Sequence, residues 1–305
     1  MQKPFILQAL PMDLSIVIIN YNTFQLTCAC IESVLQYVRN ISYEIIVVDN
    51  ASPKDNANEF LVRFPQIKLV KNPENNGFAK GNNLGIRHAA GKYILLLNSD
   101  AYLIEDCLLP AIDFMQHHRE VGALSVKILY PDGRFQKTAR RFRSLRNELL
   151  DLARPLLLMM PYSKRATLML NQYFRGDFDT EVDWVSGAFM LFPKKVVEQL
   201  PEQKLDERFF MYGEDELWCY QFKKLGYKNY FLRTTSVVHI ANASTEPAKQ
   251  LQLLKTMIAH ELEIMQEMHG RGLYYHTLKS LFLTKEYGRY WVKVLVWKVA
   301  RKKVR

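Results

Sequence analysis

The sequence predicts an α/β fold in which helices flank a mainly parallel sheet, followed by a C-terminal helical segment. Two runs rich in β-branched residues, Leu14–Asn20 and Tyr43–Asp49, enclose a segment whose apolar residues recur at helical spacing. A strand, a helix and a strand in this order form a βαβ unit, and strands that are apolar almost throughout are typical of parallel sheets. A length of 305 residues, 49% of them hydrophobic, suffices for one large core and a small appendage.

Further strands and helices follow these two runs. The predicted strands lie at residues 67–70, 93–97, 121–130, 182–192 (one bent strand or a pair), 227–233 and 236–239. The predicted helices lie at residues 57–64, 81–90 and 248–269. The strand at 93–97, with the sequence YILLL, is the most apolar of the set, so we expect it to be the most deeply buried.

Small polar side chains follow the predicted strands at their C-terminal ends. They are Asn20, Asn22, Asp49, Asn50, Asn72, Asn98 and Asp100. Ligands bind at these ends in open parallel sheets, so the sequence predicts one ligand pocket there. Asp and Asn after strands also make ordinary turns and helix caps, which is the alternative for each of them taken singly.

Two acidic segments are candidates for chemistry. Asp100 can bind a hard divalent cation, with His239 at the end of another strand as a second ligand; a helix cap is the alternative for Asp100. Gly213 is followed by three acids, Glu214, Asp215 and Glu216, and then by an apolar helix face. Three acids exceed what a helix cap needs, so we expect one of them to act as a general base.

The basic character of the chain is concentrated at its C-terminus. The net charge is +10, and residues 271–305 hold ten Lys and Arg against one acid, Glu286, which leaves about +1 for the first 270 residues. A nearly neutral body argues against a nucleic-acid partner. Lys285 and Arg289 share one face of a predicted helix with aromatic residues such as Trp291 opposite, which suits an anionic membrane surface. We expect this tail to be removable without unfolding; a helix packed on the domain is the alternative.

The sequence further predicts a cytoplasmic protein attached peripherally to the inner face of the cell membrane. The four cysteines form no CxxC pair and lie in apolar patterns, as reduced core thiols do. We expect no signal peptide, and no apolar run reaches the ~20 residues that span a bilayer. The apolar segment Leu149–Met160 contains Asp151, Arg154 and Pro155, which excludes a simple transmembrane helix.

Six stretches resemble, in order and spacing, the family-2 inverting glycosyltransferases of the GT-A fold, with a Rossmann-like nucleotide-binding sheet. The closest branch is the bacterial one that includes rhamnosyltransferases of cell-surface polysaccharide synthesis. The stretches are SIVIINYN at 15–22, IVVDNAS at 46–52, NNGFAKGNNLG at 75–85, LLNSD at 96–100, VSGAFM at 185–190 and FFMYGED at 209–215. The resemblance covers residues 14 to about 245.

The resemblance implies roles for residues of these stretches and for their neighbours. The nucleotide-sugar donor would contact Asn20, Asn22, Asp49, Asn76, Gly77, Gly81, Asn82 and Ser99. Asp100 and His239 would hold a divalent cation, Mg²⁺ or Mn²⁺, on the donor diphosphate, and Asp215 would be the catalytic base with Glu214 beside it. The acceptor side would hold Trp184, Ser186, Gly187, Arg140 and Arg141, although a solvated face remains the alternative for the two arginines.

On this reading, residues 1–245 form the catalytic domain, with a donor-binding half at 1–120 and an acceptor half at 121–245, and residues 246–305 form C-terminal helices with the basic tail. The implied reaction is inverting transfer from dTDP-rhamnose or a UDP-sugar to a saccharide or a lipid-diphosphate-linked acceptor. Three positions depart from the family pattern. Asn98 replaces the first acid of the DxD motif, Glu216 stands where an Asp often follows the ED pair, and the usual glycines after His239 are absent.

Two other functions stay open at this stage. A nucleotidyltransferase shares βαβ nucleotide pockets, but its Gly-rich loop with Lys or Arg is absent after the first strand. The other is a membrane-surface protein with a catalytically degenerate domain, against which the intact Asp49, Asp100 and Asp215 argue. The sequence leaves the sugar, the acceptor and the oligomeric state open.

Overall fold

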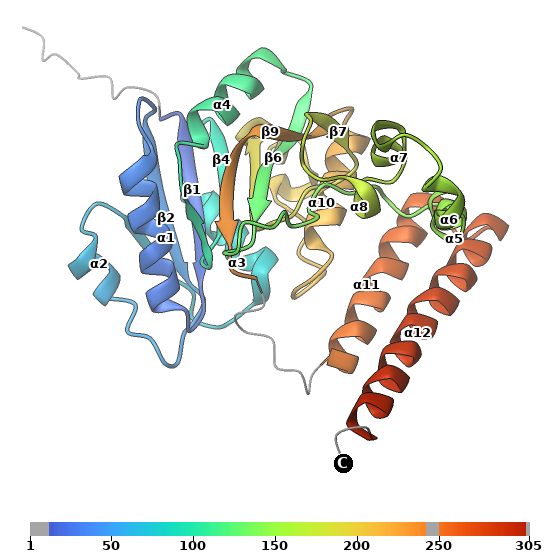
Figure 1. Cartoon of the computed structure of the whole chain (residues 1–305). Helices are drawn as coiled ribbons and strands as arrows, with labels where there is room; N and C mark the ends of the chain where they lie inside the picture. Colours follow the sequence, from blue (N-terminus) through green and yellow to red (C-terminus); the bar gives the residue numbers. More distant parts are fainter. Residues whose placement is uncertain (1–11, 242–249, 303–305) are drawn as a thin grey trace, which may run out of the picture. The chain divides into compact units, whose positions relative to one another are not determined.

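The computed structural model describes residues 12–241 and 250–302 (Figure 1). These residues form two compact units. Unit 1 comprises the described parts of 1–141 and 170–244, and unit 2 comprises 142–169 and the described part of 245–305. The sequence analysis placed residues 142–169 within the acceptor half, whereas the structure packs them with the C-terminal helices.

Unit 1 contains the sheet. Its strands are β1 (Leu14–Asn20), β2 (Tyr43–Asp49), β3 (Lys68–Lys71), β4 (Tyr93–Asn98), β5 (Ala101–Leu103), β6 (Val121–Leu129), β7 (Thr180–Val182), β8 (Phe189–Pro193) and β9 (Lys228–His239). Its helices are α1 (Phe24–Tyr37), α2 (Glu59–Arg63), α3 (Gly77–Arg87), α4 (Leu108–His117), α8 (Leu170–Tyr173), α9 (Lys194–Val197) and α10 (Glu214–Lys224). A 3₁₀ turn spans Pro201–Gln203.

The strands pair in the order β3-β2-β1-β4-β8-β6-β9-β5, and β7 pairs with β9. The first four strands of this order are parallel, β8 runs antiparallel to both of its neighbours, and β6 pairs parallel with β9. The predicted mainly parallel α/β sheet is therefore confirmed. The two short strands predicted at 227–239 are one strand, β9, which absorbs the break as a register shift opposite β6.

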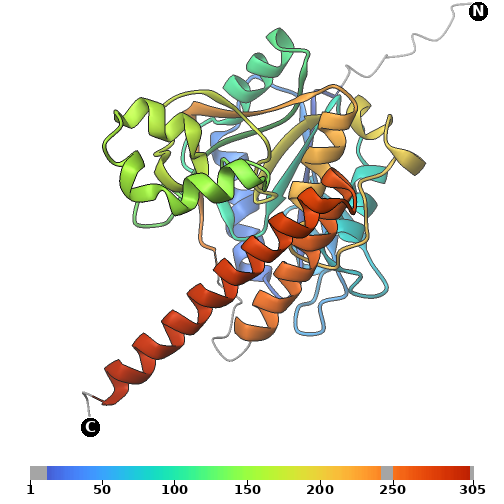
Figure 2. The same cartoon turned by 90° about the vertical axis from the view of Figure 1, so that its right-hand side faces the viewer.

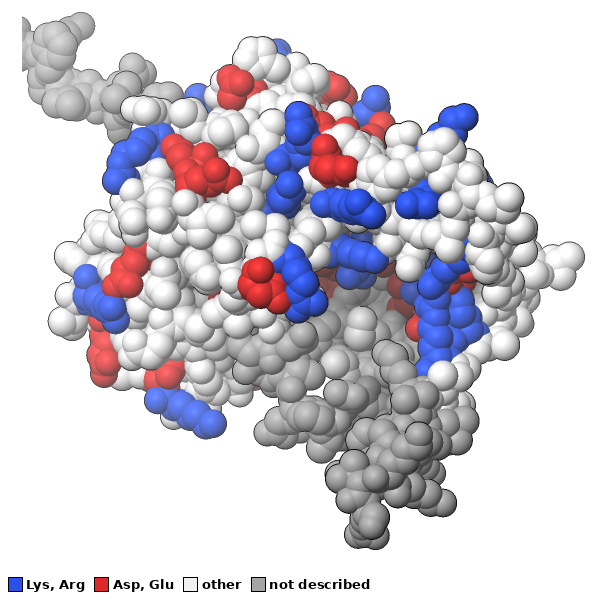
Figure 3. All heavy atoms as spheres, in the orientation of Figure 1, with Lys and Arg blue, Asp and Glu red and all other residues white. Residues whose placement is uncertain are grey.

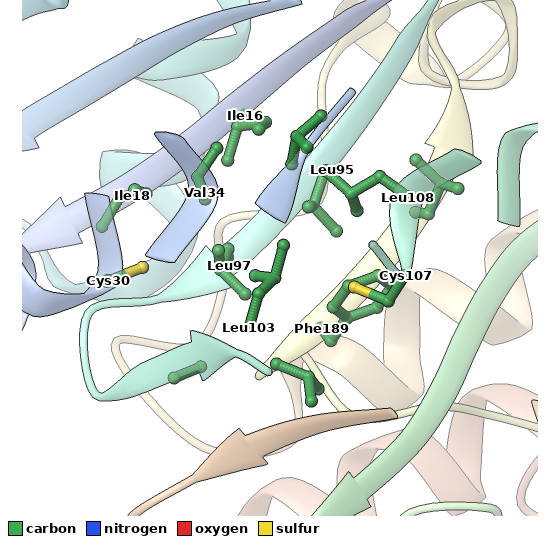
Figure 4. Packing of buried hydrophobic residues seen from close by; sticks show 14 of the residues in the cluster. Ile16, Ile18, Cys30, Val34, Leu95, Leu97, Leu103, Cys107, Leu108 and Phe189 are labelled. Atoms are coloured by element: carbon green, nitrogen blue, oxygen red, sulfur yellow. The ribbon is translucent and has the colours of Figure 1, made fainter. Parts of the chain in front are cut away.

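The buried core of unit 1 explains why these strands form. Figure 4 shows Ile16 and Ile18 of β1 beside Leu95 and Leu97 of β4, with Val34 of α1 packed over them. Alternate residues of a strand point to opposite faces, and β1 and β4 are buried on both faces, which accounts for their nearly unbroken apolar sequences. All four cysteines are buried free thiols, as expected.

Unit 2 is helical. It consists of α5 (Leu145–Leu152), α6 (Arg154–Leu157), α7 (Tyr162–Leu168), α11 (Gln250–His269) and α12 (Leu273–Lys302). Figures 1 and 2 show α11 and α12 as a hairpin, and Gly270 at the turn has a φ of 68°, a left-handed conformation that suits glycine at a helix end. The hairpin packs around Met265, Leu278 and Phe282, each at most 2% exposed.

These contacts correct the expectation for the basic tail. The first half of α12 supplies Leu278 and Phe282 to the core of unit 2, so residues 271–305 are not a separable appendage. Lys285, which was expected to face a membrane, forms ion pairs with Glu148 and Asp151 of α5, and Arg289 pairs with Asp151 at 2.8 Å. Among the described residues, none of the helices is long and apolar enough to cross a membrane.

Candidate active site

The ends of β1 and β2 together hold one carboxylate, that of Asp49. The side-chain amide of Asn20 donates to Asp49 Oδ1 at 2.8 Å, and the backbone N–H of Ser52 donates to Asp49 Oδ2 at 3.2 Å. Asn20 is fully buried, and its own carbonyl accepts from the hydroxyls of Thr23 and Thr27. Asn20 therefore orients Asp49 instead of facing a ligand, while each Asp49 oxygen keeps a second lone pair for one.

Asn22 and Ser99 lie at the same edge of the sheet. The backbone N–H of Asn22 donates to Ser52 Oγ at 3.0 Å, and its side-chain oxygen accepts from the N–H of Lys54. Thr23 Oγ1 and Ser99 Oγ lie 3.1 Å apart, within hydrogen-bond distance, which ties the end of β1 to the end of β4. The predicted polar residues of three strand ends are thus brought together.

The loop before α3 is fixed by a chain of amide groups. Asn50 is 2% exposed; it donates to Asn75 Oδ1 and to the Gly77 carbonyl, and accepts from Asn72. Gly77 has a φ of 82°, and a Cβ there would lie 2.2 Å from the carbonyl oxygen of Phe210. Glycine is therefore required where this loop meets the segment that leads to α10. Asn76 precedes it as the N-cap residue of α3.

Two more predicted donor residues lie inside α3. Gly81 faces Ile19, because a Cβ at this position would be 3.3 Å from the side chain of Ile19. Asn82 is 1% exposed and donates to the Phe78 carbonyl one turn earlier. Both residues pack α3 onto the sheet, so their effect on a donor is to position the loop in front of them.

Asp100 and His239 form a pair at the ends of β4 and β9, with His239 Nε2 3.2 Å from Asp100 Oδ1. The ring is oriented by Gln136, whose Oε1 lies 3.0 Å from His239 Nδ1. Gln136 Nε2 donates to the carbonyls of Leu129 and His239, which fixes its Oε1 as the acceptor. His239 Nδ1 must then carry the proton, and Nε2 faces Asp100.

This arrangement fits a divalent cation. Adjacent ligands of an octahedral ion with bonds of about 2.1 Å are about 3 Å apart, close to the separation of Asp100 Oδ1 and His239 Nε2. Asn98, in place of an acid, points its amide toward His239 Nε2 at 3.3 Å. In the part of the chain that the structure describes, no group of three or more His, Cys, Asp or Glu is placed to hold a metal. Phosphate oxygens and water would complete the coordination of an ion here.

The acids of α10 differ in their environments. Glu214 is 6% exposed, its Oε2 has no hydrogen-bond partner among the described residues, and burial together with the charge of Asp215 raises its pKa to about 8. Asp215 Oδ2 accepts from the backbone N–H of Gly187 at 3.0 Å, and Oδ1 accepts from that of Glu216. Burial raises the pKa of Asp215 as well, and Arg140 opposes the rise. Two N–H donors favour the ionised form of Asp215, whereas the buried Oε2 of Glu214 has none in the described part of the chain, so Asp215 is the better candidate for the base.

The predicted acceptor side gathers beside Asp215. The guanidinium carbon of Arg140 lies 4.7 Å from the ring centroid of Trp184, and the backbones of the two residues pair as an isolated bridge. Ser186 and Gly187 form the turn before β8. Arg141 is directed elsewhere, since it lies 3.8 Å from Asp183, which also pairs with Lys223.

Two residues of this region were missed from the sequence. Gln136 orients His239, and Asn83 connects α3 to residue 205 through two hydrogen bonds. Asn83 lies inside one of the quoted motifs, which was a usable signal. Gln136 stands alone in its segment, and its partner is 103 residues away in sequence.

Comparisons with known proteins bear on the family of this chain. Residues 15–198, more than half of the chain, match the family described as Glycosyl transferase family 2. The chain is 24% identical over 221 residues to the N-acetylglucosaminyl-diphospho-decaprenol L-rhamnosyltransferase of Mycobacterium tuberculosis, a match that covers 68% of this chain and 70% of the relative. It is also 24% identical over 127 residues to the minor teichoic acid biosynthesis protein GgaB of Bacillus subtilis, with 40% of this chain but only 14% of GgaB covered.

Solved structures share the fold at low identity. S. aureus TarS in complex with UDP-GlcNAc gives a TM-score of 0.57 at 16% identity, with 91% of this chain and 73% of that one covered. The mannosyltransferase PcManGT from Pyrobaculum calidifontis, in complex with GDP-Man and Mn²⁺, gives 0.57 at 15% identity, with 94% and 73% covered. The expected GT-A fold class is thereby confirmed, and the chain belongs to glycosyl transferase family 2.

Proposed function

We propose that this protein is an inverting glycosyltransferase that moves a sugar from a nucleotide-sugar donor to a saccharide or lipid-diphosphate-linked acceptor in cell-surface polysaccharide synthesis. The observation that carries the proposal is that one sheet holds both a candidate cation site and a candidate general base. A carboxylate and an imidazole suited to a cation, Asp100 and His239, lie at strand ends, and an ionisable base, Asp215, is held by the Gly187 N–H beside Trp184 and Arg140.

In this proposal, the nucleotide-sugar donor binds at the C-terminal ends of the strands. Asp49 accepts hydrogen bonds from the nucleoside, within the frame set by Asn20, Asn22, Asn76, Gly77 and Ser99. Asp100 and His239 would hold a divalent cation, which when bound would neutralise charge on the departing nucleoside diphosphate. Gly81 and Asn82 act indirectly, by packing α3.

In the proposed transfer step, Asp215 accepts the proton of the acceptor hydroxyl. Its carboxylate takes the proton from an acceptor hydroxyl as that oxygen bonds to the anomeric carbon, and the bond from that carbon to the diphosphate oxygen breaks on the opposite face. The two N–H groups that bind Asp215 aim the carboxylate without neutralising it. Trp184 offers a flat apolar face for a sugar ring, with Ser186 and Gly187 at its edge and Arg140 near acceptor phosphate. Arg141 supports this side through Asp183.

The site of action follows from the proposed acceptor. We propose a cytoplasmic enzyme attached peripherally to the inner face of the cell membrane, using dTDP-rhamnose or a UDP-sugar. The relative that is a rhamnosyltransferase carries a diphospho-decaprenol acceptor in its name, which supports a lipid-linked acceptor. The part of the basic tail that remains a candidate for membrane contact begins near Trp291, which is 59% exposed.

The test of the function is to measure the turnover of a panel of nucleotide sugars by the wild type. Turnover and affinity of the donor that is used are then measured for the Asp215→Asn variant. We expect turnover to fall ~10²–10⁴-fold while donor affinity is unchanged, because the base acts on the acceptor. The base works only when ionised and its pKa is raised, so wild-type activity should fall on the acid side at a higher pH than an ordinary aspartate gives.

Asp132→Asn is the matched control, because Asp132 is an exposed aspartate that pairs with Arg134 in a turn. It should leave turnover and its pH profile unchanged. Turnover of Asp215→Asn within about tenfold of wild type would remove Asp215 from the base role. Absence of binding to every sugar nucleotide of the panel would contradict the proposed function as a whole.

A further inference from the structure

Helix α5 turns its two acids inward and two of its four leucines, Leu149 and Leu152, outward. Glu148 is 2% exposed, and both Glu148 and Asp151 pair with Lys285 of α12. Leu149 and Leu152, between and beyond these acids, are 59% and 61% exposed. A helix that packs only against its own chain buries its apolar side and leaves its charges in water. The reversal in α5 shows that its leucine side is not explained by the folding of unit 2.

The exposed side continues into α6. Only Ala153 separates the two helices, so Leu149, Leu152 and Leu156 follow one another at helical spacing, and Leu156 is 68% exposed. Leu158 and Met159 in the next turn are 59% and 85% exposed. We call these five residues the α5–α6 apolar surface. A cluster of exposed apolar side chains marks a binding surface more often than a single exposed apolar side chain does.

The segment that carries this surface, residues 142–169, holds five Lys and Arg against two acids. The acids of residues 142–169 are Glu148 and Asp151, and both are paired with bases. Arg146 and Lys164 of the same segment are exposed. Leucines and a methionine flanked by exposed bases match the boundary between the acyl chains and the phosphates of an anionic leaflet. A symmetric contact with a second copy would instead bring the same bases toward each other.

We propose that the α5–α6 apolar surface docks onto an anionic lipid bilayer, with Leu156 and Met159 entering the headgroup boundary and Arg146 and Lys164 contacting lipid phosphates. The inference rests on the proposed function in one respect, because a lipid-linked acceptor lies in the bilayer and the enzyme must reach it there. It assigns membrane contact to a part of unit 2 other than the C-terminal tail.

The test is sedimentation of the full chain with vesicles of phosphatidylglycerol and phosphatidylcholine, and with vesicles of phosphatidylcholine alone. Leu156→Asp combined with Met159→Asp should weaken binding to the anionic vesicles at least tenfold. Val62→Asp is the matched control, because Val62 is an 84% exposed apolar residue of α2 in unit 1. It should bind like the wild type, and high salt should weaken the binding of both.

A second measurement does not depend on the doubly charged variant. Met159→Cys, labelled with an environment-sensitive dye, should shift its emission to the blue when anionic vesicles are added, and Val62→Cys should not. The native thiols are buried and leave the introduced one to react. Undiminished sedimentation of the double variant together with an unshifted dye overturns the inference. The inference is also overturned if the wild type forms a dimer without vesicles and the double variant is a monomer.

The test is independent of glycosyl transfer. Vesicle binding is measured without donor or acceptor, and donor affinity is measured in parallel on the same variants. Lost vesicle binding with unchanged donor affinity supports the docking surface even if the transfer reaction is assigned wrongly. Vesicle binding that disappears only when Lys298, Arg301 and Lys302 are changed to Ser would assign docking to the tail and overturn the inference.

Discussion

At the scale of single residues, the acids of the site are positioned by neutral hydrogen-bond donors. Asp49 is held by Asn20 and Ser52, and Asp215 by the N–H groups of Gly187 and Glu216. A neutral donor aims a carboxylate and keeps its charge available, whereas an adjacent Lys or Arg would cancel it. The same logic applies to His239, which is oriented by the amide of Gln136.

Replacing Gln136 with Met should therefore weaken metal binding. The variant keeps the volume of the side chain but removes the acceptor for His239 Nδ1, so that the ring loses its orientation and its preferred tautomer. We expect the affinity for Mn²⁺ in the presence of donor to fall about 10–100-fold. Titration calorimetry with Mn²⁺ measures this directly, and a thermal melt checks the fold.

Gln199→Met serves as the control, since Gln199 is exposed and bonds to the Tyr227 hydroxyl. Equal Mn²⁺ affinities of the Gln136 and Gln199 variants, with both folded, would show that Gln136 does not position a metal ligand.

The prominent acids could be identified from the sequence, but their partners could not. Asp49, Asp100 and Asp215 stand in motifs of recognisable order. The partner of His239 could not be identified, because a lone Gln carries no pattern and the two residues meet only through the pairing of β6 with β9. Three adjacent acids predicted a base, but only the structure shows that two N–H groups bind Asp215 while burial and the charge of Asp215 raise the pKa of Glu214.

At the scale of elements, α3 is connected at two points to the segment that leads to the base. The N–H of Phe78 donates to the Phe210 carbonyl at 2.8 Å, and Asn83 exchanges hydrogen bonds with the backbone of Leu205. The donor loop before α3 and the loop before α10 are thus tied together. We infer that a shift in one would be transmitted to the other.

Gly77→Ala tests this connection. Alanine at a φ of 82° is strained by about 1–2 kcal/mol, and its Cβ would also collide with the Phe210 carbonyl. Gly133→Ala is the matched control, because Gly133 has a φ of 81° and open space around it. We expect the Gly77 variant to be the less stable of the two in urea unfolding, and to lose donor affinity, which the Gly133 variant keeps. Equal effects would mean that the contact with Phe210 is dispensable.

Strands were easier to predict than helices for a physical reason. Runs such as Leu14–Asn20 are both rich in β-branched residues and buried on both faces. The start of α3 was missed because Gly and Asn are poor helix formers, and tertiary contacts decide where that helix begins. The reversed burial of α5 was beyond reach, because helical periodicity shows which residues share a face but not which face turns inward.

At the scale of the whole molecule, each unit has its own core and its own balance of charge. Figure 3 shows Lys and Arg interspersed with Asp and Glu over the face in view, as expected for a body close to neutral. In unit 2, Glu148 is bound by Arg143 and Lys285 inside the helical bundle. Lys285 and Arg289 of α12 thus contribute to the fold of unit 2 through their ion pairs with Glu148 and Asp151.

A chain that ends after His269 should therefore lose the structure of unit 2. The cut removes Leu278 and Phe282 from its core and leaves Glu148 without Lys285, and loss of one partner of a buried pair costs about 3–5 kcal/mol. Circular dichroism and limited proteolysis should show unfolding within 142–269. A chain that ends at Trp291 keeps these contacts and should stay folded; equal protease resistance of the two chains would contradict this.

The position of β8 between β4 and β6 bears on how the protein is made. β4 ends at Asn98, but its neighbour β8 begins only at Phe189. A ribosome that adds 5–20 residues per second therefore needs roughly 5–20 s after β4 to reach β8. During this interval the nascent parallel half has an open edge with the sequence YILLL, a template for pairing with other chains. We expect nascent chains that stop short of β8 to depend on chaperones that cover this edge until β8 emerges.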